Sequence, residues 1–375
     1  MAATSALQLL VLPASELASQ TDAWRRAVLG VACFGSTLPQ ALAGLDLPLA
    51  QVQVQALRQG AVSSEDWCEI WTAAAPLRGG AQGRLRWRCN AAVLFGVLTL
   101  AAAELGTRPA PRLDASLLGQ GAAGPWWAGI AGQPSPLQRA TEQVYDELFG
   151  AIEALGFPHL LRVWNHIPDI NRESSGMEHY RQFNIGRQDA FLAHGRQIGG
   201  CSVPSASALG AAGGAPLVVY FIAGSRPPVA IENPRQLSAY HYPADYGPRA
   251  PTFSRANLAC IAGRPALFLS GTASIVGHRT LHHGDVVEQT REILRNIEAV
   301  LRQAGAQGAP GLTLQDLHYK VYVRHAADQP AIQAELQHRV GCGLRALYLQ
   351  ADVCRLDLLV EIEAVALPGS QELAC

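Results

Sequence analysis

The sequence predicts an α/β fold built from two copies of one unit. Helix, strand, helix and strand follow one another within residues 135–224, and the same order returns within residues 285–366, about 150 residues later. The composition is that of a tightly turned globular protein: of 375 residues, 36 are Gly, 23 are Pro and only 16% are charged. We therefore expect duplicated units of mixed β-sheet with helices packed on one face, divided as residues 1–223 and 224–375.

The first half is expected to begin with strands at residues 7–12, 27–34 and 91–100, followed by a loop at 106–124. Its pattern becomes clear at the first helix, which begins with Ser135 and Pro136, a capping residue and a first-turn proline. Apolar residues then recur at helical spacing until Gly156 ends the helix, namely Leu137, Val144, Leu148, Ile152 and Leu155. A strand at 159–167, a helix at 176–195 and a strand at 215–224 complete the unit.

The second half repeats this series. Asp285 is the expected cap of an amphipathic helix whose apolar face carries Ile293, Ile297, Val300 and Leu301. A strand at 317–324, a helix at 329–340 and a strand at 354–366 follow.

Bulk properties exclude several classes of protein. The net charge of −1 predicts no general attraction to nucleic acid or to anionic membranes. The eight cysteines contain no CxxC pair, which is typical of buried thiols in a reduced, cytoplasmic protein. The N-terminus lacks the basic segment of a signal peptide, and the apolar stretch 90–106 is too short to span a membrane.

Two polar stretches carry little signal by themselves. His278, His282 and His283 follow the strand that ends in "SGTAS", but their spacing matches no zinc motif, and we interpret them as loop residues rather than metal ligands. The small residues of "SGTAS" (270–274) are typical of a tight turn, although they would also let a ligand approach the backbone. The sequence has no GxxxxGK[ST] or GxSxG motif and no GxGxxG between an expected strand and an expected helix, so nucleotide binding and serine hydrolase chemistry have no support.

Two groups of tyrosine and arginine are more informative. Tyr180 and Arg187 lie seven residues apart on one stripe of the helix at 176–195, and a phenol with a guanidinium can clamp a carboxylate. The loop "SAYHYPADYGPRAPTFSRA" holds a second such group, which includes Tyr242 and Arg255. Together they favour a ligand with two carboxylates.

Glu361 stands in the apolar strand "LLVEIE" and shares a face with Glu363. In a closed pocket such a glutamate would have a raised pKa and could transfer a proton near neutral pH, whereas on a solvent face it would be an ordinary polar residue. Composition alone favours the second alternative, an ordinary polar residue on a solvent face.

Several long stretches in the same order resemble the chorismatase family: "YRQFNIGR", "NPRQLSAYHYPADYGPRAPTFSRA", "LFLSGTASIVGH", "VVEQTREILRNI" and "LLVEIE". The resemblance covers residues 135–365, and the segment from "LFLSGTASIVGH" onwards is similar to the small RidA/YjgF fold. It implies cofactor-free hydrolysis of chorismate with release of pyruvate, at a site between the two halves.

The resemblance also implies roles for individual residues. Glu361 is the catalytic acid, and Tyr180, Arg187, Tyr242 and Arg255 bind the substrate. Residues 270–274 line the pocket, with Gly271 and Ser274 as substrate-binding residues and no metal. Cys354, seven residues before Glu361, is typical of members that form 3-hydroxybenzoate, with 4-hydroxybenzoate as a second product in one group. Because positions seven apart on a regular strand face opposite ways, Cys354 can reach the site only through a bulge or a strand start.

Three alternatives remain at this stage. A chorismatase could release the non-aromatic dihydroxy-cyclohexadiene acid with pyruvate. A RidA-like imine hydrolase would need only one arginine, and a non-catalytic metabolite-binding protein would not need Glu361. The partner expected is a small molecule, and a duplicated chain could be a monomer or a homotrimer.

Overall fold

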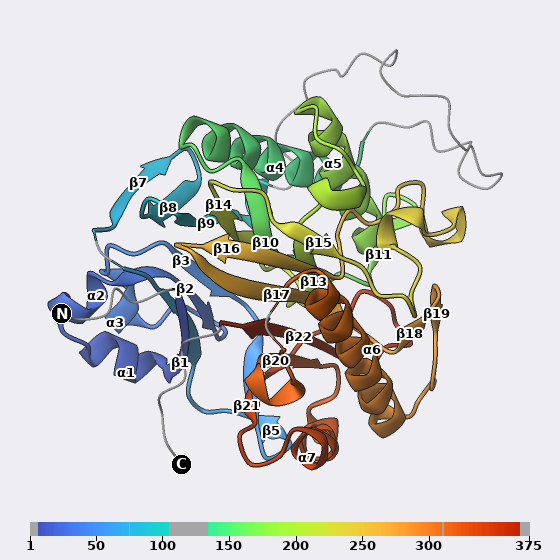
Figure 1. The fold of residues 1–375 in the computed structure, drawn as a ribbon. Helices are drawn as coiled ribbons and strands as arrows, with labels where there is room; N and C mark the ends of the chain where they lie inside the picture. Colours follow the sequence, from blue (N-terminus) through green and yellow to red (C-terminus); the bar gives the residue numbers. More distant parts are fainter. Residues whose placement is uncertain (1–6, 75, 105–133, 310, 368–375) are drawn as a thin grey trace.

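A computed structural model describes residues 7–74, 76–104, 134–309 and 311–367 (Figure 1). The strands of these residues form sheets of four, six and eight strands, together with two short hairpins. The mixed α/β class expected from the sequence is confirmed. The loop expected at 106–124 lies outside the described residues.

Duplication is visible in the strand order of the two larger sheets. The first unit has the order β7-β8-β9-β14-β10-β13, and the second has the corresponding order β15-β16-β17-β22-β20-β21. In each, the last two strands of this order pair in parallel and the other pairs are antiparallel. The first unit consists of β7 (Arg78–Gln82), β8 (Leu85–Cys89), β9 (Val93–Leu100), α4 (Pro136–Ala154), β10 (His159–Pro168), α5 (His179–Ala193), β13 (Ser205–Ala211) and β14 (Leu217–Gly224). The second consists of β15 (Val229–Ile231), β16 (Ala256–Ile261), β17 (Arg264–Thr272), α6 (Val286–Ala306), β20 (His318–Val323), α7 (Gln329–Val340), β21 (Arg345–Gln350) and β22 (Val360–Ala366).

The N-terminal segment adds a third sheet. Its order is β1-β6-β2-β3, and its elements are β1 (Gln8–Pro13), α1 (Ala14–Ser19), α2 (Asp22–Arg25), β2 (Val28–Phe34), α3 (Gln40–Ala43), β3 (Leu49–Val52) and β6 (Trp67–Thr72). Between β3 and β6, the strands β4 (Gln55–Arg58) and β5 (Ala61–Val62) extend the sheet of the second unit beyond β21. The N-terminal segment therefore contributes to the C-terminal sheet, and the division at residue 223 stays a prediction.

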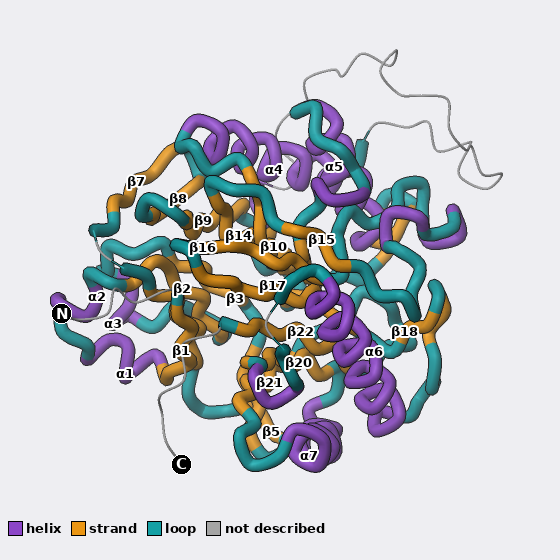
Figure 2. The backbone as a smooth tube through the Cα atoms, in the orientation of Figure 1, coloured by secondary structure: helices purple, strands orange, loops and turns teal. Residues whose placement is uncertain are grey.

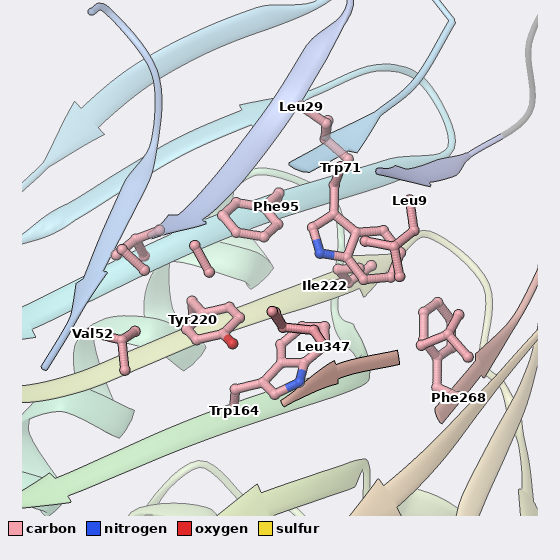
Figure 3. Packing of buried hydrophobic residues seen from close by; sticks show 14 of the residues in the cluster. Leu9, Leu29, Val52, Trp71, Phe95, Trp164, Tyr220, Ile222, Phe268 and Leu347 are labelled. Carbon is pink, nitrogen blue, oxygen red and sulfur yellow. The ribbon is translucent and has the colours of Figure 1, made fainter. Parts of the chain in front are cut away.

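The helices lie on the outside and the sheets face one another. Apolar residues of α4 and α5 pack on the six-stranded sheet, and those of α6 and α7 pack on the eight-stranded sheet. In Figure 2 the orange strands fill the middle of the molecule between these two purple pairs of helices. The inner faces of all three sheets share one core, in which Trp71 lies 5.8 Å from Trp164 and 6.2 Å from Phe268 between ring centroids (Figure 3). This core fixes the two units against each other.

Local signals located the main elements well. Ser135 caps α4 by accepting a hydrogen bond from the backbone N–H of Gln138 at 3.1 Å, and Asp285 caps α6 in the same way through Glu288 at 3.0 Å. The strands expected at 7–12, 27–34, 159–167 and 215–224 are confirmed as β1, β2, β10 and β14. The apolar stretch from residue 90 forms β9, and no helix in the described ranges is long and apolar enough to cross a membrane.

Two expected elements differ in the structure. The helix expected at 176–195 begins only at His179, because Met177–Glu178 forms β12, which pairs with β11 (Glu173–Ser174). The strand expected at 354–366 begins only at Val360, because the backbone N–H of Leu358 bonds to the carbonyl of Arg355 in a turn.

The expectation of buried thiols holds for part of the chain. Cys33, Cys68 and Cys89 are buried free cysteines, whereas Cys260 and Cys342 are exposed.

Candidate active site

A cavity of about 270 Å³ opens between the two units. The first unit contributes residues of α5 and β13, and the second contributes β17, β22 and the loops 232–255 and 351–359. Seven of the eight site residues expected from the sequence line this cavity: Tyr180, Arg187, Tyr242, Arg255, Gly271, Cys354 and Glu361. Residues almost 200 positions apart in the chain therefore meet in one small volume.

Ser274 is the exception. It is fully buried, and its hydroxyl donates a hydrogen bond to the carbonyl of Leu281 at 3.0 Å. It is not among the residues that line the cavity. This hydrogen bond joins the two ends of the short hairpin formed by β18 (Ile275–Val276) and β19 (Arg279–Thr280).

Arg187 and Arg255 are buried cations that form no ion pair with any described carboxylate. Arg187 is 3% exposed and Arg255 is 6% exposed, and the Nε atom of each has no hydrogen-bond partner. Arg255 donates through Nη2 to the Tyr242 hydroxyl at 2.9 Å. Burying an unpaired charge is unfavourable, so two such cations around one cavity fit a ligand that carries two acidic groups.

The helix α5 presents Tyr180 on the same side as Arg187, as the seven-residue spacing predicts. Burial raises the pKa of Tyr180 above that of a free phenol. Tyr180 therefore stays protonated and can donate a hydrogen bond to an anion beside Arg187.

Two further arginines line the cavity without having been predicted, Arg181 and Arg355. The guanidinium of Arg355 lies 4.1 Å from the ring centroid of Tyr246, and it donates to the carbonyl of His278 at 2.9 Å. Tyr246 also donates to this carbonyl, at 2.7 Å. Tyr246 belongs to the tyrosine-rich loop noted in the sequence, whereas Arg355 stood next to Cys354 without any motif of its own.

Two carboxyl groups line the cavity, those of Glu178 and Glu361. Glu178 is paired with Arg181 at 3.5 Å, whereas Glu361 lies near the beginning of β22 with 4% of its surface exposed and forms no salt bridge in the described part of the chain. Burial raises the pKa of Glu361 to about 8, and the nearby negative charge of Glu363 adds to this effect. At neutral pH the side chain is therefore a carboxylic acid that can donate a proton. Composition alone favoured a solvent-facing glutamate, and this expectation is wrong: Glu361 is buried and lines the cavity.

Gly271 makes room for this carboxyl group. A Cβ atom at position 271 would lie 1.8 Å from Oε1 of Glu361, far inside contact distance. The pairing of β17 with β22 shifts register between Leu269 and Thr272, which brings Gly271 against Glu361. The glycine is therefore needed for steric reasons in the observed position of the acid.

Behind Glu361 lies a buried charge network that the sequence did not reveal. Glu363 forms salt bridges with Arg162 at 2.6 Å and with Lys320 at 2.9 Å, and Lys320 also pairs with Glu69 at 2.6 Å. Burial alone would raise the pKa of Glu363, but the two cations more than offset this and hold it at about 2. Arg162 and Lys320 come from β10 and β20, the corresponding strands of the two units.

Cys354 lies in the loop before β22, so the alternation of a strand does not apply to it. Arg324 holds this loop by donating to the carbonyls of Val353, Arg355 and Leu358 at 3.1, 2.9 and 2.8 Å. Burial raises the pKa of the Cys354 thiol to about 12, and the neighbouring Glu361 contributes to the rise. Cys354 is therefore a neutral, polarizable wall of the cavity rather than a thiolate nucleophile.

The three histidines after "SGTAS" lie in separate contacts. His278 faces Tyr246, His282 lies 3.9 Å from Glu292, and His283 lies 3.5 Å from Asp357. In the described part of the chain, no group of three or more His, Cys, Asp or Glu side chains could hold a metal ion.

Two buried arginines without a salt bridge and one buried glutamate in the same cavity define a site for a small dianion and for proton transfer to it. Residues 126–223 match the family model described as "Chorismatase FkbO/Hyg5-like, N-terminal". A chorismatase of Streptomyces rapamycinicus is 37% identical over 80% of this chain and 82% of its own length. A 3-hydroxybenzoate synthase of Streptomyces hygroscopicus is 42% identical over 63% of this chain and 73% of its own length.

A solved chorismatase structure covers 98% of this chain and all of its own, with 29% sequence identity and a TM-score of 0.77. The chain belongs to the chorismatase family. The family expected from the sequence is therefore confirmed. Small proteins of the YjgF family, such as Rv2704 of Mycobacterium tuberculosis, also match over about a third of the chain, with a TM-score of 0.24 for that protein.

Proposed function

We propose that this protein converts chorismate to 3-hydroxybenzoate and pyruvate by acid catalysis with its own side chains. The observation that carries the proposal is the buried Glu361 in one cavity with Arg187 and Arg255, two buried arginines that form no salt bridge in the described part of the chain. Chorismate has two carboxylates and an acid-labile enol ether, so its chemistry matches these groups. The names of the two Streptomyces relatives support the same substrate and the aromatic product.

In this proposal each arginine binds one carboxylate. Arg187 with Tyr180 holds one end of the dianion, and Arg255 with Tyr242 holds the other. Bidentate arginine contacts supply both charge and orientation, which places the enol ether next to Glu361. A pocket for a small imino acid would need only one such arginine, so the second pair favours chorismate over an imine substrate.

Glu361 then donates its proton to the methylene carbon of the enolpyruvyl group, and the adjacent ether carbon becomes an oxocarbenium-like centre. Attack by water and release of pyruvate would yield the dihydroxy-cyclohexadiene acid. Attack by the ring hydroxyl instead leads to aromatisation. Chorismate then divides into 3-hydroxybenzoate and pyruvate without net uptake of water.

Cys354 and Gly271 support the aromatic route. Both line the cavity beside Glu361, and Gly271 contacts its carboxyl group. In our proposal they shape the space around the ring and limit where water can attack. Ser274 acts only through the shape of the adjacent turn, since its hydroxyl is bonded to Leu281.

Incubation of the purified protein with chorismate tests the proposal directly. The products are separated by chromatography against 3-hydroxybenzoate, 4-hydroxybenzoate and the dihydroxy acid, and pyruvate is measured enzymatically. Equal amounts of 3-hydroxybenzoate and pyruvate are expected. The dihydroxy acid alone would indicate the hydrolytic alternative, and binding without turnover would indicate a metabolite-binding protein.

The monomeric or trimeric state and a cytoplasmic location remain predictions.

A further inference from the structure

The carboxyl groups of Glu361 and Glu363 point to the same face of β22, but their surroundings differ. Glu363 accepts hydrogen bonds from Ser207 at 2.7 Å and from Trp164 at 2.6 Å, in addition to its two salt bridges. Glu361 has no salt bridge within the described part of the chain. One acid is therefore paired at contact distance, whereas Arg162 and Arg255 act on its neighbour Glu361 only through space, without a salt bridge.

The network beneath Glu361 is balanced in charge. Two buried anions, Glu69 and Glu363, face two buried cations, Arg162 and Lys320. The nearby His166 adds no charge, since burial, reinforced by Lys320, lowers its pKa to about 3. Every cation of this group is already in contact with an anion. An ionised Glu361 would therefore have to share Arg162 with Glu363, although Arg162 and Arg255 both favour its charge through space.

We propose that Glu363 is a positioning residue that keeps Glu361 in its protonated, proton-donating form by occupying Arg162 and Lys320. The inference rests on the proposed function of Glu361 as the catalytic acid. The charge balance also favours return of a proton to Glu361 after each turnover, because the anion formed by proton donation would lie next to the charge of Glu363.

Ser207 connects the two carboxyl groups. Its hydroxyl donates to Glu363 and accepts from the backbone N–H of Gly271 at 3.0 Å. Both the Ser207 Oγ and the Glu361 Oε1 lie within 3.0 Å of the point that a Cβ atom on Gly271 would occupy. Charge on Glu363 is therefore held close to the cavity wall and is not separated from Glu361 by solvent.

Other charged and titratable groups also surround Glu361, and all of them would be retained in the test below. They come from each element packed around it: Arg162 on β10, Glu178 on β12, Tyr180, Arg181 and Arg187 on α5, Tyr322 on β20, Arg255 before β16, and Cys354 and Arg355 in the loop before β22.

Two substitutions with opposite expected signs test the proposal. Glu363→Gln removes an anion and leaves the network with an excess positive charge, so Glu361 should ionise at lower pH. Lys320→Met removes a cation and leaves an excess negative charge, so Glu361 should ionise at higher pH. Each shift is expected to be about one pH unit or more, as found for charges a few ångströms apart.

The shifts are measured in two ways. The basic limb of kcat/KM against pH reports the ionisation of the free enzyme's acid. NMR of protein labelled with ¹³C at the glutamate carboxyl carbon, with Glu361 assigned by its loss in Glu361→Gln, reports the same titration without substrate. The NMR titration therefore tests the charge coupling even if the protein does not turn over chorismate, and the kinetic profile tests the proposed function separately.

Folding of each variant is checked by circular dichroism, and Lys320→Met alone suffices if Glu363→Gln does not fold. Combining both substitutions restores neutrality and should return the titration midpoint towards that of the unchanged protein. A merely structural role would lower activity without moving the midpoint. Midpoints that stay at the unchanged value in both single variants would overturn the proposal.

Discussion

Glu361→Gln should abolish turnover and at the same time stabilise the protein at alkaline pH. The amide keeps the shape of the side chain but cannot deliver a proton, and loss of general acid catalysis should lower turnover by about a hundredfold or more. The stability effect follows from the raised pKa of Glu361, about 8 instead of 4.5. Between these values the folded protein holds a proton that the unfolded chain releases, so its stability decreases as the pH rises.

The magnitude follows from proton linkage at about 1.4 kcal/mol per unit of pKa. The unfavourable contribution of Glu361 to the free energy of unfolding is under about 1 kcal/mol at pH 5 and about 4 kcal/mol at pH 8. The stability of Glu361→Gln relative to the unchanged protein should therefore increase by about 3 kcal/mol between these two conditions. Any constant effect of the buried amide cancels in this difference.

Urea unfolding followed by tryptophan fluorescence at pH 5 and pH 8 measures this difference, and chromatography measures turnover. Glu153→Gln is the matched control, because its carboxylate lies at the surface, 48% exposed, in a pair with Arg196. A stability difference that does not grow with pH would refute the buried, protonated state of Glu361. Near-normal turnover would remove Glu361 from the mechanism.

The remaining predictions concern pH, ligand binding, product and metal. For the unchanged protein, kcat/KM should fall about tenfold per pH unit above the Glu361 pKa of about 8, and a profile that keeps rising there would contradict an acid role. Arg187→Ala and Arg255→Ala should each weaken chorismate binding by about 2–5 kcal/mol, measured by calorimetry, and unchanged affinity would exclude that arginine from the site. Cys354→Val should shift the product towards the dihydroxy acid or slow the reaction, and chromatography that shows an unchanged profile at normal rate would exclude control by Cys354. Activity should survive dialysis against EDTA, and inactivation that zinc reverses would contradict the interpretation of the histidines.

Sequence reasoning succeeded where the signal is local. The ends of α4 and α6 follow from Ser135 and Asp285, because a cap and an apolar period are properties of neighbouring residues. The pairing of Tyr180 with Arg187 as ligands for a carboxylate was predicted in the same way, from their spacing on one helix. Their meeting with Glu361 in one cavity was implied by family resemblance, since spacing within one element says nothing of the other side of a pocket.

The charge network could not be predicted because it is entirely long-range. Arg162 and Glu363 are 201 positions apart, and no pattern within either strand marks one as the partner of the other. Without the fold, Glu363 is only the second glutamate of an alternating strand. The strands β4 and β5 were not predicted for a similar reason. Their place at the edge of the C-terminal sheet depends on pairing with β21, almost 300 residues later.

The duplicated fold explains how two acids can be buried side by side without a net charge. In the second unit β22 carries Glu361 and Glu363, whereas the corresponding strand β14 of the first unit is apolar throughout. Arg162 on β10 of the first unit supplies one counter-ion for Glu363, and Lys320 on β20 of the second supplies the other. Neither unit alone contains both cations, so the packed pair is required for the balance. The two copies have therefore diverged. The eight-stranded sheet of the second unit carries Glu361, Glu363 and Lys320, and the six-stranded sheet of the first unit carries Arg162, with the cavity between the two units.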